Sequence, residues 1–224
     1  MKKKQPATPQ TRRALDHGLF SPSNLQMEFE PKIFRTIIFV RHGQYSSDPE
    51  VLTALGRKQA KKTAKALREL MPSKLHCSTM PRAIETAAII GQEIGLKARS
   101  SDVFREGLLP GTIGFNNFVT KGKTPEQVKE HFAKTKLARK QADSAFSELF
   151  KTPQKGQSVE VVVAHGNVIR YWVCKALDIS EEKWLMMDVS HTSLTTIRIS
   201  KSGNMILLGF SDTGHLPLKM RTYV

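Results

Sequence analysis

Two strand-like runs, each followed by a histidine and a glycine, constrain the fold of this chain more than any other feature. The first run covers residues 33–40 and leads into Arg41-His42-Gly43, and the second covers 159–163 and leads through Ala164 into His165-Gly166. β-Branched and apolar runs of this length, ended by a glycine turn, are typical of buried parallel strands. Because functional groups of such sheets gather at the carboxyl ends of the strands, we expect both histidines in one site.

The remaining periodicity predicts an α/β fold: a single three-layer domain with a mostly parallel, mixed sheet flanked by helices. Apolar residues recur at helical spacing after a capping Thr53, and this helix is predicted to run to about residue 70 with Met71 facing inward. Residues 193–199 and 205–210 are predicted to form a hairpin, which makes the sheet mixed. One further helix is predicted over 81–94, and another is predicted to start at a capping box in 124–127 and to end at about 150. Further short strands are predicted over 74–77 and 97–101.

Two details of the connections are also predicted. Residues 107–124 are rich in glycine and proline and lack a period, which favours a loop over the site. Asn167 stands between the second strand-like run and an apolar helical stripe, and it is therefore predicted to be the N-cap of that helix.

The length of 224 residues favours one domain with a sizeable core. Residues 1–31 are polar, contain prolines and lack a period, so they are predicted to form an extended or disordered arm before a domain at 32–224. Two cysteines are too few for a disulfide framework or a four-cysteine zinc site, and reduced thiols favour a cytoplasmic location. The first 15 residues contain arginine and no acid, which leaves mitochondrial targeting as the alternative.

Lysine and arginine outnumber aspartate and glutamate by 35 to 20, a formal net charge of +15, so the protein should attract anions. Part of this excess lies at 121–155, but no aromatic platform of the kind that binds nucleic acid interleaves its basic residues, and no nucleic-acid partner is expected. No apolar run approaches the roughly 20 residues that a membrane helix needs, so no membrane span is expected.

Four blocks follow one another in an order that suits a single pocket. They are residues 41–43, 78–86, 105–107 and 165–167, with sequences RHG, STMPRAIET, REG and HGN. Together they resemble the phosphoglycerate-mutase-like histidine phosphatase superfamily, over about residues 35–215. Within it the chain is most similar to the mitochondrial serine/threonine protein phosphatase branch, phosphoglycerate mutase family member five. The matching stretches are 41–45, 52–60, 82–86, 167–171 and 212–214. The N-terminal membrane segment and tryptophan-containing assembly motif of that branch are not found in this sequence.

The resemblance and the chemistry of the side chains assign the same roles. His42 is the predicted nucleophile, and its attacking nitrogen must be unprotonated while a backbone carbonyl holds the proton on the other ring nitrogen. Arg41 and Arg82 are predicted to bind the phosphoryl oxygens, with His165 as a further donor. Glu106 is the carboxylate predicted to protonate the leaving alkoxide and then to deprotonate water.

Two further residues are candidates for the pocket wall. Arg57 resembles a pocket residue of the superfamily but lies on a lysine-rich helix face, where solvation is an equal alternative. His191 stands where the superfamily commonly has an asparagine, and its spacing alone indicates only a loop. No metal or other cofactor is expected, because the histidines lack ligand-spaced carboxylates or cysteines and the arginines would repel a cation.

The predicted function is that of a phosphomonoester hydrolase that acts through a phosphohistidine, with phosphoserine and phosphothreonine proteins as the favoured substrates. A small-metabolite phosphatase of the same superfamily is the first alternative, and a non-catalytic basic binding or scaffold module is an alternative of another class. A mutase is disfavoured because Gln44-Tyr45-Ser46 replaces the Glu-Ser stretch of those enzymes. The expected partner is a phosphorylated protein or a small phosphomonoester, and the sequence is compatible with a homodimer.

Overall fold

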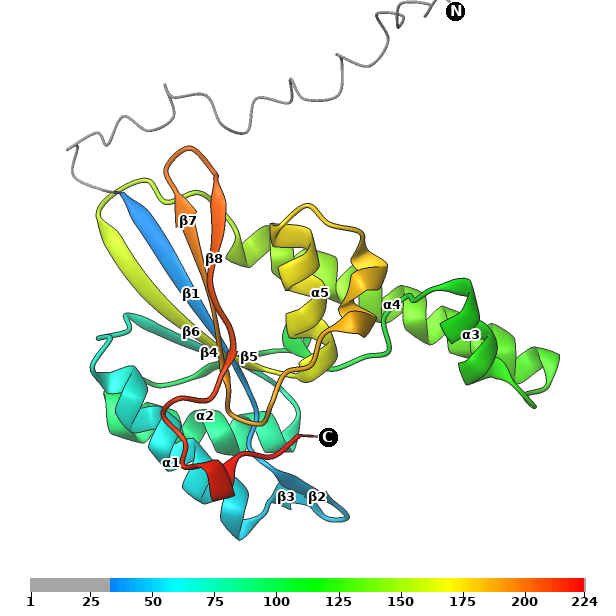
Figure 1. Ribbon diagram of the computed structural model, residues 1–224, viewed down its shortest axis with the longest axis horizontal. Coiled ribbons are helices and arrows are strands. Elements are labelled where there is room, and N and C mark those ends of the chain that lie inside the picture. Colours follow the sequence, from blue (N-terminus) through cyan, green and yellow to red (C-terminus); the bar gives the residue numbers. More distant parts are fainter. Residues whose placement is uncertain (1–32, 224) are drawn as a thin grey trace, which may run out of the picture. The chain divides into compact units, whose positions relative to one another are not determined.

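A six-stranded mixed sheet forms the centre of the structure, a computed structural model that describes residues 33–223. The predicted arm at 1–31 lies outside the described residues. The strand order is β5-β4-β6-β1-β7-β8 (Figure 1), in which β5, β4, β6 and β1 are parallel and β7 and β8 are antiparallel to their neighbours. The strands are β1 (Phe34–Arg41), β4 (Lys74–Ser78), β5 (Arg99–Ser101), β6 (Gln157–Ala164), β7 (Leu194–Ser200) and β8 (Met205–Asp212).

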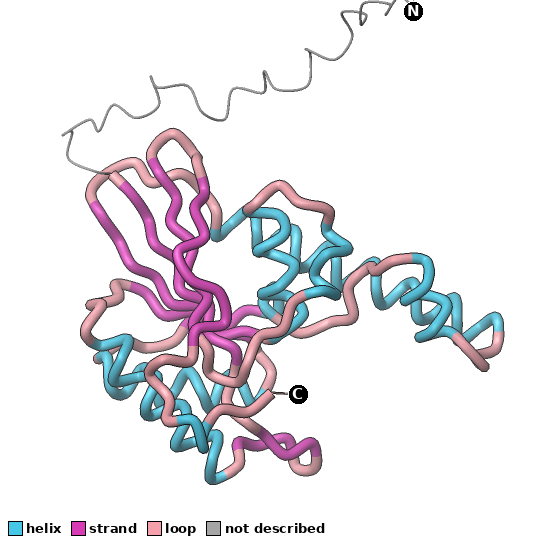
Figure 2. Tube along the Cα trace, in the orientation of Figure 1, coloured by secondary structure: helices cyan, strands magenta, loops and turns pink. Residues whose placement is uncertain are grey.

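Helices cover both faces of the sheet, which confirms the predicted three-layer α/β fold (Figure 2). On one face lie α1 (Ala54–Arg68) and α2 (Pro81–Ile94), and on the other lie α4 (Pro125–Leu149) and α5 (Gly166–Ala176). A short helix, α3 (Ile113–Thr120), precedes α4, and the hairpin of β2 (Tyr45–Ser47) and β3 (Glu50–Leu52) follows β1. Short 3-10 helices occur at Asp102–Phe104, Glu181–Met186 and Leu218–Met220.

Alternating residues of β1 supply the two cores. Ile37 and Phe39 pack with Trp172 of α5, whereas Ile38 and Val40 pack with Leu67 of α1 on the opposite face. All six side chains are at least 98% buried. Because a strand directs successive side chains to opposite faces, β1 must be apolar throughout to lie between two helical layers.

The predicted N-terminal caps of α1 and α4 are present. The Thr53 hydroxyl accepts a hydrogen bond from the Gly56 N–H at the start of α1, and Thr124 and Gln127 form both bonds of a capping box at the start of α4. Gly95 ends α2 with a left-handed backbone at φ 72°, a conformation that favours glycine.

Three local predictions are wrong. Residues 107–124 are not a continuous loop, because Thr112 caps α3 by accepting the Phe115 N–H at 3.2 Å. Met71 does not face inward, since α1 ends before it and its side chain is 83% exposed. Asn167 is not an N-cap: His165 holds that position, and the Asn167 side chain instead donates to the Gly107 carbonyl at 3.3 Å.

Candidate active site

The two predicted histidines lie at adjacent strand ends, as the sequence indicated. β1 and β6 are parallel neighbours with Arg41 opposite Ala164, and the next residue, His42, donates its backbone N–H to the Ala164 carbonyl at 3.0 Å. The ring centroids of His42 and His165 are 5.1 Å apart. Both residues are almost completely buried, at 2% and 0% exposure. The register of β1 against β6 therefore places the two imidazole rings side by side in one pocket.

Two hydrogen bonds fix the tautomer of His42. Its Nδ1 lies 2.9 Å from the Gly43 carbonyl, which can only accept, so Nδ1 carries the proton. Arg82 Nε donates to His42 Nε2 at 3.0 Å, so Nε2 carries the lone pair. Nε2 is thus the nitrogen available to attack an electrophile. The hydrogen bond from Nδ1 to the Gly43 carbonyl is the backbone contact that the sequence analysis predicted for the other ring nitrogen.

The two arginines approach this pocket from different elements. Arg82 is in the first turn of α2, where backbone N–H groups add positive potential, and Arg41 ends β1. Each is only 6% exposed. Arg41 Nη1 donates to the Val189 carbonyl at 2.6 Å, which fixes the plane of its guanidinium.

Glu106 and His165 carry buried atoms that have no protein partner within residues 33–223. These atoms are Glu106 Oε1, His165 Nδ1 and His165 Nε2, and Arg41 Nε is a fourth. Buried polar groups are nearly always hydrogen-bonded, so their gathering in one pocket indicates a site for a polar ligand. The other Glu106 oxygen, Oε2, accepts the Asn167 backbone N–H at 3.4 Å.

Burial sets the protonation of these groups. Burial, with a smaller contribution from the neighbouring His165, holds the pKa of His42 well below its usual range, and burial and Arg82 do the same to the pKa of His165. Burial raises the pKa of Glu106 despite its hydrogen bonds and the nearby arginines. At neutral pH the imidazoles are therefore neutral, as a nucleophile requires, and the pKa of Glu106 is shifted in the direction that a general acid needs.

Close packing against α1 and α2 holds the loop that follows β1. The Gly43 N–H donates to Thr86 Oγ1 at 3.0 Å, and the Gln44 N–H donates to Gln59 Oε1 at 2.9 Å. A Cβ atom on Gly56 would lie 2.0 Å from the Gln44 carbonyl oxygen, so only glycine fits there. The position of His42 thus depends on packing and hydrogen bonds from α1 and α2.

Of the two weaker candidates, His191 lies in the pocket and Arg57 lies outside this cluster. The His191 ring centroid is 5.6 Å from that of His42, and its Nδ1 is 3.0 Å from Thr222 Oγ1. Burial, with Arg41 nearby, lowers the pKa of His191 to about 4. Arg57 is about half exposed and donates to Glu85 at 2.6 Å, as expected for the solvated alternative.

The structure adds two residues that sequence reasoning missed, Tyr45 and Glu50 of the β2–β3 hairpin. The Tyr45 ring is edge-on to His42 at 5.1 Å between centroids, and the Arg82 guanidinium lies 4.6 Å from the Tyr45 centroid. Glu50 Oε1 accepts from Arg82 Nη1 at 2.6 Å. No motif marks Glu50, because its position depends on the path of a short hairpin.

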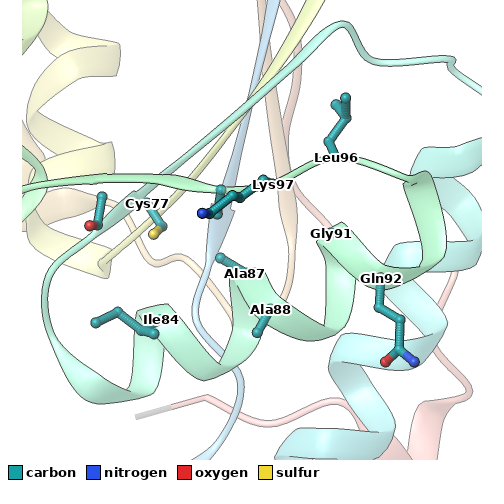
Figure 3. A pocket seen from close by; sticks show the side chains of 10 residues that line it. Cys77, Ile84, Ala87, Ala88, Gly91, Gln92, Leu96 and Lys97 are labelled. Atoms are coloured by element: carbon teal, nitrogen blue, oxygen red, sulfur yellow. The ribbon is translucent and has the colours of Figure 1, made fainter.

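A separate hollow of about 360 Å³ lies between α2 and residues 96–100 (Figure 3). Its wall includes Ala87 and Gly91 of α2, with Leu96 and Lys97 opposite, and it includes none of the predicted site residues. Within the described part of the chain, no group of three or more histidine, cysteine or acidic side chains could hold a metal ion.

The fold and the site together define a histidine phosphatase of the phosphoglycerate mutase type. A phosphoglycerate mutase from Plasmodium falciparum superposes with a TM-score of 0.58 at 26% identity, covering 83% of this chain and 96% of that one. A phosphoserine phosphatase from Entamoeba histolytica superposes with a TM-score of 0.61 at 19% identity, covering 82% of this chain and 100% of that one, and it supports the fold alone.

The sequence comparisons agree. Residues 37–210 match the histidine phosphatase superfamily, branch 1. A mitochondrial serine/threonine-protein phosphatase Pgam5 from Drosophila grimshawi is 37% identical, covering 86% of this chain and 68% of the relative. The protein of the same name from Caenorhabditis elegans is 36% identical, covering 82% and 64%. The chain therefore belongs to the histidine phosphatase superfamily, which confirms the predicted family and enzyme class. None of the helices between residues 33 and 223 has the length and apolar character needed to span a membrane.

Proposed function

We propose that this protein hydrolyses phosphoserine and phosphothreonine in proteins through a phosphohistidine at His42. The observation that carries the proposal is the fixed tautomer of His42, whose Nε2 lone pair lies among buried arginines and next to His165. A phosphoryl group fits this pocket because guanidinium groups match its oxygens in charge and geometry.

In the first step His42 Nε2 attacks phosphorus, so that the N–P bond forms as the bond to the ester oxygen breaks. Arg82 must leave Nε2 and turn its N–H groups to the transferring oxygens, while Arg41 Nε and His165 donate to the same oxygens. Glu106 gives its proton to the leaving alkoxide, which departs as an alcohol. The raised pKa of Glu106 supports this role, since the acid must hold its proton until transfer.

In the second step the Glu106 carboxylate takes a proton from water as the water oxygen attacks phosphorus. The N–P bond breaks, inorganic phosphate is formed, and His42 returns to its neutral state. The buried position of Glu106 suits both steps, because its low-polarity surroundings favour the neutral carboxyl at the end of each cycle.

The substrate class and the location come from the relatives. The printed names of the Drosophila and Caenorhabditis proteins describe serine/threonine protein phosphatases, and they carry the word mitochondrial. They support a protein substrate and the mitochondrial alternative for this chain, and nothing in these comparisons supports the cytoplasmic location expected first. The arm at 1–31 and the homodimer stay predictions.

The test is turnover of phosphoserine and phosphothreonine peptides beside a panel of sugar and glycerate phosphates, with chelator present. We expect peptide turnover in the wild type and none in His42→Ala. Rapid quenching should trap phosphate in an acid-labile, base-stable bond to His42. Turnover of the small esters alone would support the metabolite phosphatase instead.

His131→Ala is the matched control, since it removes a histidine of α4 that has no part in the site. It should turn over peptide as the wild type does. Phosphate trapped on another residue, or wild-type turnover in His42→Ala, would contradict the assignment. A rate that a chelator abolished and a divalent ion restored would contradict the metal-free mechanism.

A further inference from the structure

The β2–β3 hairpin places a carboxylate on the arginine that the reaction needs. Glu50 begins β3, and its Oε1 accepts from Arg82 Nη1 at 2.6 Å. Tyr45 begins β2 and packs against both the Arg82 guanidinium and the His42 ring. The hairpin thus contacts the nucleophile and one phosphate-binding group together.

The guanidinium of Arg82 is occupied on two sides by the protein itself. Its Nε donates to His42 Nε2 and its Nη1 donates to Glu50. A guanidinium binds a phosphoryl group through the same N–H groups, commonly two at a time. A phosphoryl group on or next to His42 Nε2 therefore competes with Glu50 for Arg82.

Burial indicates which partner moves. The Arg82 side chain is 8% exposed, whereas the Glu50 side chain is 31% exposed. The carboxylate can turn into water without losing hydration, but the guanidinium is enclosed by the pocket. Arg41 differs, because the group that holds its Nη1 is the Val189 carbonyl and not a carboxylate.

The other end of the hairpin is anchored. The Leu52 N–H at the end of β3 donates to Glu85 Oε2 at 2.8 Å, and Glu85 also accepts from Arg57. The hairpin therefore keeps its place on α2 when Glu50 turns away. Motion of the Glu50 side chain alone is enough to release Arg82 Nη1 from the hairpin.

We propose that Glu50 is a displaceable anion for Arg82, which holds the guanidinium in the free enzyme, yields it to the phosphoryl group of the substrate and, by returning, favours release of inorganic phosphate. A dianionic phosphoryl group outcompetes the single carboxylate while it is bound at His42. Once the alcohol has left and phosphate is the only ligand, Glu50 lowers its affinity. The inference rests on the proposed function, in which Arg82 binds phosphate.

The test measures inhibition of p-nitrophenyl phosphate turnover by inorganic phosphate in the whole 224-residue chain. Glu50→Gln keeps the shape and removes the charge, and Glu50→Ala removes the acceptor as well. Both should bind phosphate more tightly, by roughly three- to fivefold, the factor expected for one partly exposed ion pair. Asp48→Asn is the matched control: it removes one acid from the same hairpin, and the Asp48 side chain is exposed and does not contact Arg82 in the described structure. Its inhibition constant should be that of the wild type.

Tighter binding is an outcome that damage to the fold would not produce. Weaker phosphate binding in both Glu50 variants would overturn the proposal and show that the ion pair organises Arg82 for phosphate. The proposal would also be overturned if the Glu50 variants had the same inhibition constant for phosphate as Asp48→Asn. Arg82→Ala tests the proposed function separately, because turnover by this variant should no longer be inhibited by phosphate. If the wild type itself showed none, phosphate binding at Arg82 would be refuted.

Discussion

Replacing Glu106 by glutamine tests the proposed chemistry most directly. Glu106 is the buried acid of the pocket, with Oε2 held by the Asn167 N–H and Oε1 without a protein partner in the described structure. Glutamine has nearly the same shape and can keep the hydrogen bond, but its amide N–H is too weak an acid to transfer a proton. The substitution therefore removes acid catalysis while it leaves His42 and the arginines in place.

The loss should depend on the leaving group. General acid catalysis contributes about 10²- to 10⁴-fold, or about 3–5 kcal/mol of activation free energy. An alkyl phosphate such as a phosphoserine peptide needs the whole of this contribution, because its alkoxide is a poor leaving group. An aryl phosphate needs much less, because the phenolate leaves without protonation. Glu106→Gln should therefore slow peptide turnover far more than p-nitrophenyl phosphate turnover.

The pH profile gives a second measurement. Glu106 must be protonated for the first step, and its pKa is raised by burial, so wild-type kcat/KM for the peptide should fall as pH rises through that pKa. His42 must be neutral, and its lowered pKa places the acidic limb well below pH 6.5. Glu106→Gln should lose only the basic limb. Equal losses on alkyl and aryl esters, or a basic limb retained in the variant, would refute acid catalysis by Glu106.

Two further predictions concern stability and surface charge. His42 and His165 fold in the neutral form with lowered pKa values, so acidification below about pH 6.5 should cost up to about 1.4 kcal/mol of unfolding free energy per pH unit for each. Denaturant unfolding at pH 7 and pH 5.5 should show a smaller difference in His165→Asn, and equal differences would contradict neutral burial. Lys136 and Lys140 of α4 line a hollow of about 520 Å³, and reversing both to glutamate should lower kcat/KM for acidic phosphopeptides and flatten its salt dependence, with p-nitrophenyl phosphate turnover retained. If neither peptide turnover nor its salt dependence changed, this face of α4 would have no role in peptide association.

The sequence predicted most of the sheet and its helices because the signals are local and repeated. The apolar run of β1, the N-cap of α1 and the capping box of α4 each lie within a few residues. Parallel strand ends then meet at one edge by geometry, and this is why His42 and His165 could be paired in advance. Residues 107–124 misled the prediction because glycine and proline mark both loops and helix ends, and α3 has no buried residue to give it a period.

The site was predictable where the chemistry is local and was missed where it depends on tertiary contact. Arg41 and His42 are neighbours in sequence, but Glu50 contacts Arg82 across 32 residues and Glu85 contacts Leu52 across 33. A charged residue on a short hairpin has the same sequence appearance whether it contacts water or a guanidinium. Such pairs follow only from the folded arrangement of the hairpin on α2.

The polar groups that the reaction needs in this pocket lower the stability of the folded state. Two arginines are buried beside two neutral histidines, and both ring nitrogens of His165 lack a protein partner within the described residues. Burying such groups without hydrogen bonds opposes folding, so the cores on the two faces of the sheet must offset it. A bound phosphoryl group supplies the missing acceptors, and its binding stabilises the folded state by mass action. When phosphate is absent, the carboxylate of Glu50 supplies one acceptor for Arg82. The residue proposed to favour product release therefore also stabilises the free enzyme.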